Sequence, residues 1–122
     1  MTAVWLAPAA SAESVVLPEQ PGQAGVVFIE DPAIVDPHPM PAESFSRATN
    51  DRVIGLHFTT GTPECYGVSA TVAETAETVT VELRSGTRPD AVDRACIMIA
   101  VAGTLEVTLD SPLGDRQVMS VY

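Results

Sequence analysis

Cys65 and Cys96 are the two cysteines of this 122-residue chain, and their side chains are the best suited to chemistry. A thiolate beside a histidine base can act as a nucleophile, and thiolates together with imidazoles can bind zinc. His57 lies eight residues before Cys65, and His38 is the other histidine. No nucleophile motif surrounds Cys65, and the paired spacings of structural zinc sites are missing. We therefore predict no catalytic residue, no metal site and no cofactor.

A disulfide between Cys65 and Cys96 is the simplest use of two cysteines in an exported protein, because an oxidising compartment lets the bond persist. Closing a loop of about 32 residues would restrict the unfolded chain and stabilise the fold by roughly 3–4 kcal/mol. We therefore predict a structural bridge that joins the starts of two strands.

The bridge would also draw together the polar loops beside it. The residues there form a candidate binding patch: Glu64, Tyr66, Asp90, Asp93 and Arg94. Such residues commonly cap turns and form local salt bridges. The more specific alternative is a small binding site for a ligand or a partner. The sequence leaves both interpretations open.

The first residues have the pattern of the end of a secretory signal. A short apolar run at 3–7 leads to Ala10-Ser11-Ala12, the small-x-small pattern of a signal peptidase site, although a positively charged start is missing. We expect residues 1–12 to be a signal remnant or leader and the protein to be secreted or held in the cell envelope. No apolar run reaches the 18 residues of a membrane-spanning helix, so we predict no transmembrane segment.

The net charge of −10 narrows the classes of partner. The six basic residues are all arginine, against 16 acidic residues. Such a surface repels nucleic-acid phosphates and anionic lipid headgroups, so we predict no nucleic-acid binding. A protein or another envelope component remains as the expected partner.

Residues 13–43 form a proline-rich stretch that holds six of the ten prolines. Proline lacks a backbone donor and has a fixed φ, so this stretch cannot be a helix or a central strand. We predict an extended arm with a short strand at 25–30, which could pair with a sheet edge, and a weaker candidate at 33–36.

From residue 44 to 122 the apolar residues alternate with polar ones, as in half-buried strands. Turn residues separate these segments at roughly ten-residue spacing. The pattern predicts an all-β, Ig-like antiparallel β-sandwich of about seven strands with one disulfide. The expected strands are 44–48, 53–60, 67–74, 78–84, 96–102, 104–110 and 116–121.

Two segments carry more detailed predictions. Within 53–60, the alternation places Ile54, Leu56 and Phe58 in the core and leaves His57 on the solvent face. The segment 96–102 is apolar on both faces, which is typical of a buried central strand. We expect Gly103 to reverse the chain into the next strand, and residues 90–95 to form a single helical turn.

The stretch from Cys65 to Val118 resembles small uncharacterised exported proteins common in actinobacteria. The matching segments are "GTPECYGV", "VTVELRSGTRPDAVDRACIMIA" and "TLEVTLDSPLGDRQV", with the matching residues Cys65, Gly86, Pro89, Arg94, Ala95, Cys96, Leu109, Pro112, Leu113 and Gly114. The resemblance implies an exported β-domain and carries no catalytic residue across. This chain lacks the lipid-anchoring cysteine that many of those proteins have.

These observations together predict an exported, non-enzymatic binding or structural module of the cell envelope, such as an accessory subunit of a larger assembly. The extended arm suits a segment that lies along a partner surface. The alternative is a small-ligand binder or hydrolase that uses the acidic residues near the Cys65–Cys96 bridge.

Overall fold

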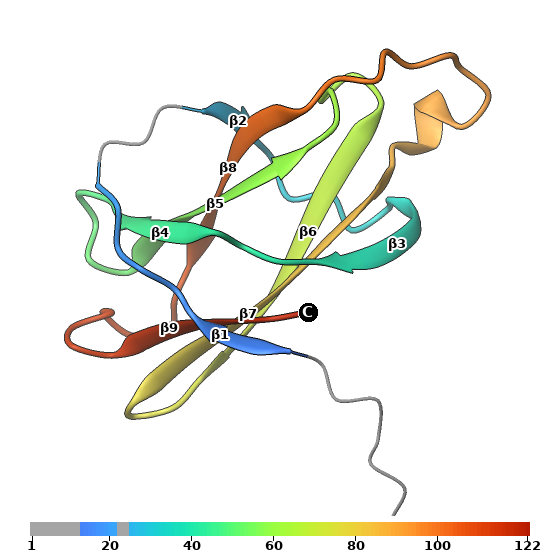
Figure 1. Cartoon of the computed structure of the whole chain (residues 1–122). Coiled ribbons are helices and arrows are strands. Elements are labelled where there is room, and N and C mark those ends of the chain that lie inside the picture. The colour runs from blue at the N-terminus through green and yellow to red at the C-terminus, as the bar shows by residue number, and fades with distance from the viewer. Residues whose placement is uncertain (1–12, 22–24) are drawn as a thin grey trace, which may run out of the picture.

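The computed structural model describes residues 13–21 and 25–122, and the leader predicted at 1–12 lies outside them. Two β-sheets enclose one hydrophobic core (Figure 1), and no α-helix occurs in the described part of the chain. The predicted all-β sandwich with one disulfide is confirmed, with nine described strands in place of about seven. The Ig-like topology stays a prediction.

One sheet has four strands in the order β2-β8-β5-β4. Its centre is the antiparallel pair of β5 (Val53–Thr60) and β8 (Val101–Thr108). At one edge β4 (Ser44–Arg47) lies antiparallel to β5, and at the other edge β2 (Val26–Phe28) lies parallel to β8. Since β5 and β8 are the longest strands here, they carry most of this sheet's core face.

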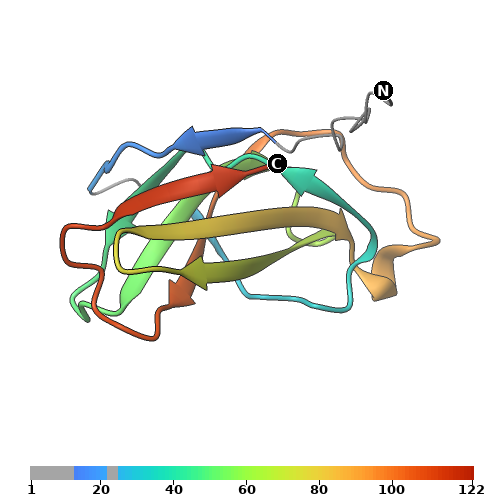
Figure 2. The same ribbon diagram turned by 90° about the horizontal axis from the view of Figure 1, so that it is seen from below.

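The second sheet is built on β7 (Thr78–Thr87). β6 (Tyr66–Glu74) pairs with one edge of β7 along its whole length. Two strands share the other edge one after the other, as Figure 2 shows: β9 (Gln117–Val121) and then β3 (Val35–Met40). β1 (Ser14–Val16) pairs with β9 and completes the sheet.

The core consists of the inward-facing side chains that the period-two pattern predicts. Ile54, Leu56 and Phe58 of β5 are buried against Val81 and Leu83 of β7 in one apolar cluster. Each fully buried side chain of this size contributes about 1.5–3 kcal/mol. The alternation of apolar and polar residues along these strands therefore identifies the core face correctly.

Residues 13–43, predicted as an extended arm, supply β1, β2 and β3 and so contribute to both sheets. Pro37 and Pro39 lie within β3, which among the described strands pairs only with β7 and is an edge strand there, the position in which a sheet tolerates proline. Two apolar residues of this stretch are buried in the core: Leu17, directly after β1, and Met40, the last residue of β3. The short strand predicted at 25–30 pairs with a sheet edge, as expected.

The predicted strand at 96–102 and its hairpin at Gly103 are wrong. β8 begins only at Val101 and continues through Gly103 without reversing, so residues 95–100 precede the strand as irregular chain. A Cβ atom on Gly103 would lie 2.6 Å from the Phe58 ring and 2.7 Å from the Phe28 ring. The glycine is therefore needed for close packing of two aromatic rings against β8, and not for a turn.

The helical turn predicted at 90–95 is shorter and starts earlier. It is the 3-10 turn η1 (Pro89–Ala91), which has a proline in its first turn and buries Ala91. A proline is favoured at such a start, because the first helical positions need no backbone donor. η1 and the irregular chain after it form the loop from β7 to β8, at the upper right of Figure 1.

Candidate functional site

The Cys65–Cys96 disulfide is present, as predicted, with the two Cα atoms 6.2 Å apart. Cys65 is buried directly before β6, whereas Cys96 lies in the irregular chain and not at the start of a strand. Because the two sulfur atoms are bonded to each other, neither is available as a nucleophile or a metal ligand. The bridge fixes the loop after η1 to the start of β6.

Backbone hydrogen bonds support the bridge on the β6 side. Cys65 and Tyr66 both donate their backbone N–H to the carbonyl of Thr62, at 3.1 and 2.9 Å. The carbonyl of Cys65 accepts the N–H of Arg88 at 2.8 Å, and the Arg88 side chain donates to the carbonyl of Pro63. This tight turn sets the position of Tyr66, the first residue of β6.

The predicted binding patch is mostly exposed. Glu64, Asp90, Asp93 and Arg94 are exposed to solvent, and only Tyr66 is half-buried. The Asp90 carboxylate forms an ion pair with Arg88 at 3.4 Å, and both side chains are exposed. This is a local salt bridge of the kind expected if these residues only stabilise turns. Exposed pairs of this kind contribute little to stability.

An exposed apolar segment, which the sequence places in the core, lies directly after the bridge. Ile97, Met98 and Ile99 are 62%, 91% and 49% exposed. They border an open hollow of about 420 Å³ together with Tyr66, the end of β5 at 59–60 and Gly61. Exposed contiguous apolar surface is typical of an interaction site.

A second hollow, of about 360 Å³, lies on the other side of Tyr66. Val27 and Ile29, which are 71% and 84% exposed, border it, and the charged residues Glu30, Asp31 and Arg88 also line it. Tyr66 lines both hollows, so the two lie next to each other on the surface. We call this surface the apolar end of the molecule, defined by Val27, Ile29, Tyr66, Ile97, Met98 and Ile99.

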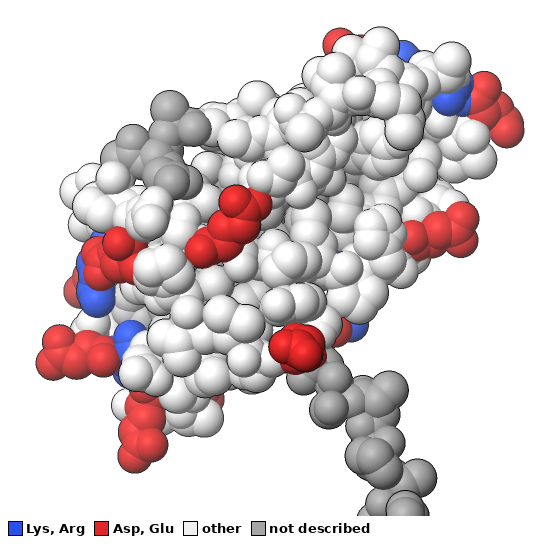
Figure 3. Space-filling view, viewed as in Figure 1, with Lys and Arg blue, Asp and Glu red and all other residues white. Residues whose placement is uncertain are grey.

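The space-filling view supports this description of the apolar end. In Figure 3, the surface over β2 and the adjoining loop before β8 is largely free of charged groups, which lie at its margins. Acidic side chains are scattered over the rest of the same face, at mid-height and below, and others lie at the top and upper right. The apolar end therefore differs in character from the rest of this acidic protein.

His57 is buried, so its predicted place on a solvent face is wrong. The residue is 5% exposed, and its ring forms hydrogen bonds of 2.9 Å with the hydroxyl of Thr104 on β8 and with that of Ser46 on β4. A Cβ atom on Gly55 would lie 2.9 Å from the Ser46 hydroxyl, so this glycine leaves room for the contact. Burial lowers the pKa of His57, which favours the neutral ring.

The Ser46, His57 and Thr104 side chains include a hydroxyl next to an imidazole base, the pair that nucleophilic catalysis uses. Here the imidazole uses both ring nitrogens to join three neighbouring strands of one sheet. Since the ring is almost fully buried, the arrangement fits a polar cross-link of β4, β5 and β8.

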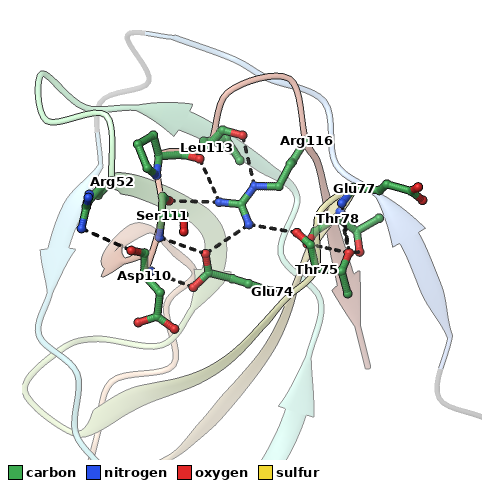
Figure 4. Close-up of polar contacts among 10 residues, drawn as sticks. Arg52, Glu74, Thr75, Glu77, Thr78, Asp110, Ser111, Leu113 and Arg116 are labelled. Atoms are coloured by element: carbon green, nitrogen blue, oxygen red, sulfur yellow. Dashed lines mark hydrogen bonds and ion pairs between the residues drawn. The ribbon is translucent and has the colours of Figure 1, made fainter.

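Glu74 and Arg116 form a second polar cluster that the sequence did not indicate (Figure 4). The Glu74 carboxylate lies 3.1 Å from the Arg116 guanidinium and accepts the backbone N–H of Asp110 at 2.7 Å. Arg116 donates to four backbone carbonyls, those of Thr75, Ser111, Pro112 and Leu113. The backbone hydrogen bond from Asp110 is the main reason that the pKa of Glu74 is lowered, and Arg116 adds to it.

This cluster fixes the turn between β6 and β7 to the loop between β8 and β9. Glu74 and Arg116 are 42 positions apart, and no local motif marks either residue. Because each polar group has a partner within the cluster, its chemistry fits a structural clamp.

Neither histidine lies in a cluster of three or more side chains able to hold a metal ion, within residues 13–21 and 25–122. No helix in those ranges is long and apolar enough to cross a membrane. Comparisons with protein-family models, with curated proteins and with solved structures found no match.

Proposed function

We propose that the protein is an exported, non-enzymatic binding or structural module of the cell envelope, and that it docks onto a protein or another envelope component. The observation that carries this proposal is the apolar end. Ile97, Met98 and Ile99 expose apolar side chains on adjacent positions, in a chain that buries most of its other large apolar side chains in one core. Such surface costs solubility unless a partner covers it.

The disulfide supports both the compartment and the mode of binding. A bond of this type persists in oxidising compartments outside the cytoplasm, and the resemblance to exported actinobacterial proteins points the same way. The bridge also restrains the residue directly before Ile97. A binding segment that is held in place loses less conformational entropy when a partner docks.

The proline-rich arm supports the proposal less than its sequence suggests. Its three strands already pair with β9, β8 and β7 of the same molecule, so one side of each strand is used within the fold. A partner is therefore expected at the apolar end, to which the arm contributes Val27 and Ile29.

Site-specific photocrosslinking tests the proposal. A photoreactive residue replaces Ile99 in the full chain, and the matched control replaces Val16 on β1, because both side chains are 49% exposed. We expect the probe at Ile99 to crosslink an envelope component in intact cells and the probe at Val16 to crosslink much less. Equal yields from the two positions would contradict a docking role for the apolar end.

The hollow of about 360 Å³ bordered by Val27 and Ile29 favours a second candidate function, small-ligand binding. It brings Arg88 together with Glu30 and Asp31, so a polar ligand would find charges of both signs beside an aromatic ring. Ligand screening by thermal shift, with Tyr66→Ala as the comparison, tests this alternative. A hydrolase that uses the acidic residues near the bridge would in addition show activity that depends on Glu64 or Asp90.

A further inference from the structure

Two adjacent carboxylates, those of Glu30 and Asp31, line the hollow of about 360 Å³, which we call the acidic hollow. Donors of the same molecule hold one oxygen of each. Oε1 of Glu30 accepts the Ser69 hydroxyl at 2.7 Å and the Ala70 N–H at 2.9 Å. Oδ1 of Asp31 accepts the N–H of Ala33 at 3.0 Å. The carboxylates are therefore fixed in place, and each keeps a second oxygen that these bonds do not use.

No ion pair balances the charge of these two carboxylates. Within residues 13–21 and 25–122, no arginine lies within ion-pair distance of Glu30 or Asp31. Arg88 lines the same hollow, but its Nε pairs with Asp90 at 3.4 Å and its Nη1 donates to the carbonyl of Pro63 at 3.2 Å. The negative charge of the whole chain acts in the same direction as the two carboxylates, so the acidic hollow favours a cation.

The border of the acidic hollow is also apolar, which restricts the kind of cation. Val27 and Ile29 are largely exposed there, and Tyr66 adds an aromatic side chain. An inorganic cation would leave these side chains uncovered, and a neutral apolar group would bring no counter-charge. The side chains of lysine and arginine satisfy both requirements, because their stems lie along apolar surface and their heads pair with carboxylates or aromatic rings.

The neighbouring surface favours a protein as the source of this cation. On the other side of Tyr66, the side chains of Ile97, Met98 and Ile99 remain exposed beside the second hollow. A free amine in the acidic hollow would not cover them. A protein that offers a basic side chain between apolar residues would fill the acidic hollow and cover this segment in one contact.

We infer that the partner of the apolar end presents a lysine or arginine side chain flanked by apolar residues, and that this side chain enters the acidic hollow and pairs with Glu30 and Asp31. The inference rests on the proposed docking function, because it names the chemistry of the partner at the same surface. The attraction is between opposite charges, so added salt screens it and weakens the complex.

Variants that remove only the two charges test the inference. In Glu30→Gln combined with Asp31→Asn, the amide oxygens can still accept the hydrogen bonds from Ser69, Ala70 and Ala33. With the photoreactive residue at Ile99, we expect this double variant to lower the crosslinking yield in intact cells at least about fivefold. Thermal unfolding checks that the variant is folded.

The matched control is Glu64→Gln combined with Asp93→Asn. It removes the same number and kind of charges from exposed positions that do not line the acidic hollow. We expect it to change the crosslinking yield less than about twofold. Equal yields from the two double variants would overturn the role of Glu30 and Asp31.

Capped tripeptides test the cation directly. Val-Lys-Val and Val-Arg-Val are compared with Val-norleucine-Val, each acetylated and amidated, in NMR titrations that follow the backbone N–H groups of Gly67 and Arg88. We expect at least one basic peptide to bind at least about tenfold more tightly than the norleucine peptide. The preference should shrink in the Glu30→Gln, Asp31→Asn variant and between about 50 and 500 mM NaCl.

Two results of the titration would overturn the inference. One is the absence of a preference for either basic peptide, which includes the absence of any shift at millimolar concentration. The other is binding of butylamine as tight as that of the basic peptides, which would make the acidic hollow a site for a small amine and not for a protein side chain.

The inference and the docking function can fail separately. If the probe at Ile99 crosslinks an envelope protein equally well with and without the charges of Glu30 and Asp31, the docking function stands and the basic side chain is wrong. If the probe at Ile99 crosslinks no more than the probe at Val16, the docking function is wrong and the inference falls with it.

Discussion

Tyr66 and Glu74 are the first and last residues of β6, and each takes part in the feature that characterises its end of the sandwich. Tyr66 lies between the two hollows of the apolar end, next to the disulfide. Glu74 forms the ion pair of the clamp with Arg116. One end is thus closed by polar contacts within the molecule, and the other exposes apolar side chains.

Removal of the disulfide should destabilise the fold. In Cys65→Ser combined with Cys96→Ser, we expect the free energy of unfolding to fall by roughly 3–4 kcal/mol, because the unfolded chain regains the freedom of a loop with a sequence separation of 31. Urea denaturation measures the loss, and reduction of the wild type is the independent check. A change below about 1 kcal/mol would contradict a stabilising role for the bridge.

The clamp should make stability depend on pH in the acid range. The pKa of Glu74 is lowered in the folded protein, so its contribution is present above the ordinary carboxyl pKa and is lost as the pH falls through the folded value. In Glu74→Gln, the melting temperature should therefore fall less between pH 6 and pH 3 than in the wild type. Glu82→Gln, from the exposed pair with Arg84, is the matched control and should leave that slope nearly unchanged.

His57 should affect stability in a different pH range. Its pKa is lowered from 6.5 by burial, so the unfolded chain takes up a proton before the folded one does. Stability should fall as the pH drops below about 6.5 towards the folded value, and should not change above it. NMR titration of the ring measures the shift directly. His38→Asn, at an exposed position, should leave this pH dependence intact, and His57→Asn should remove it.

Gly103→Ala should destabilise the sandwich by about 1–3 kcal/mol, because the added methyl group overlaps the rings of Phe28 and Phe58. Ala102→Ser, at the exposed neighbouring position of β8, should change the free energy of unfolding by less than about 0.5 kcal/mol. Chemical denaturation of both variants measures the difference. Similar stability of the two would show that the rings move aside without cost.

Much of the fold follows from local pattern, as β5 and β7 illustrate. The side chains of a strand alternate between two faces, so Ile54 and Leu56, like Val81 and Leu83, mark their core faces without any knowledge of the partner strand. The disulfide was predictable for a related reason, since two cysteines allow only one pairing within the chain.

The candidate site was less accessible to sequence reasoning. The sequence of an apolar run such as Ile97-Met98-Ile99 is the same whether the run is buried in the core or exposed, because hydrophobicity alone does not determine which residues cover it. The alternating pattern shows on which face of the strand His57 lies. It does not show that His57 is buried there, between the hydroxyl groups of two neighbouring strands.

The amino-acid sequence by itself determined the all-β class, most of the strand positions and the bridge, because these depend on the alternation of neighbouring residues and on the residue types present. Tertiary structure alone decided that residues 13–43 complete both sheets, that Glu74 meets Arg116 and that residues 97–99 face solvent. Each of these outcomes depends on contacts between segments far apart in the chain, which no local pattern encodes.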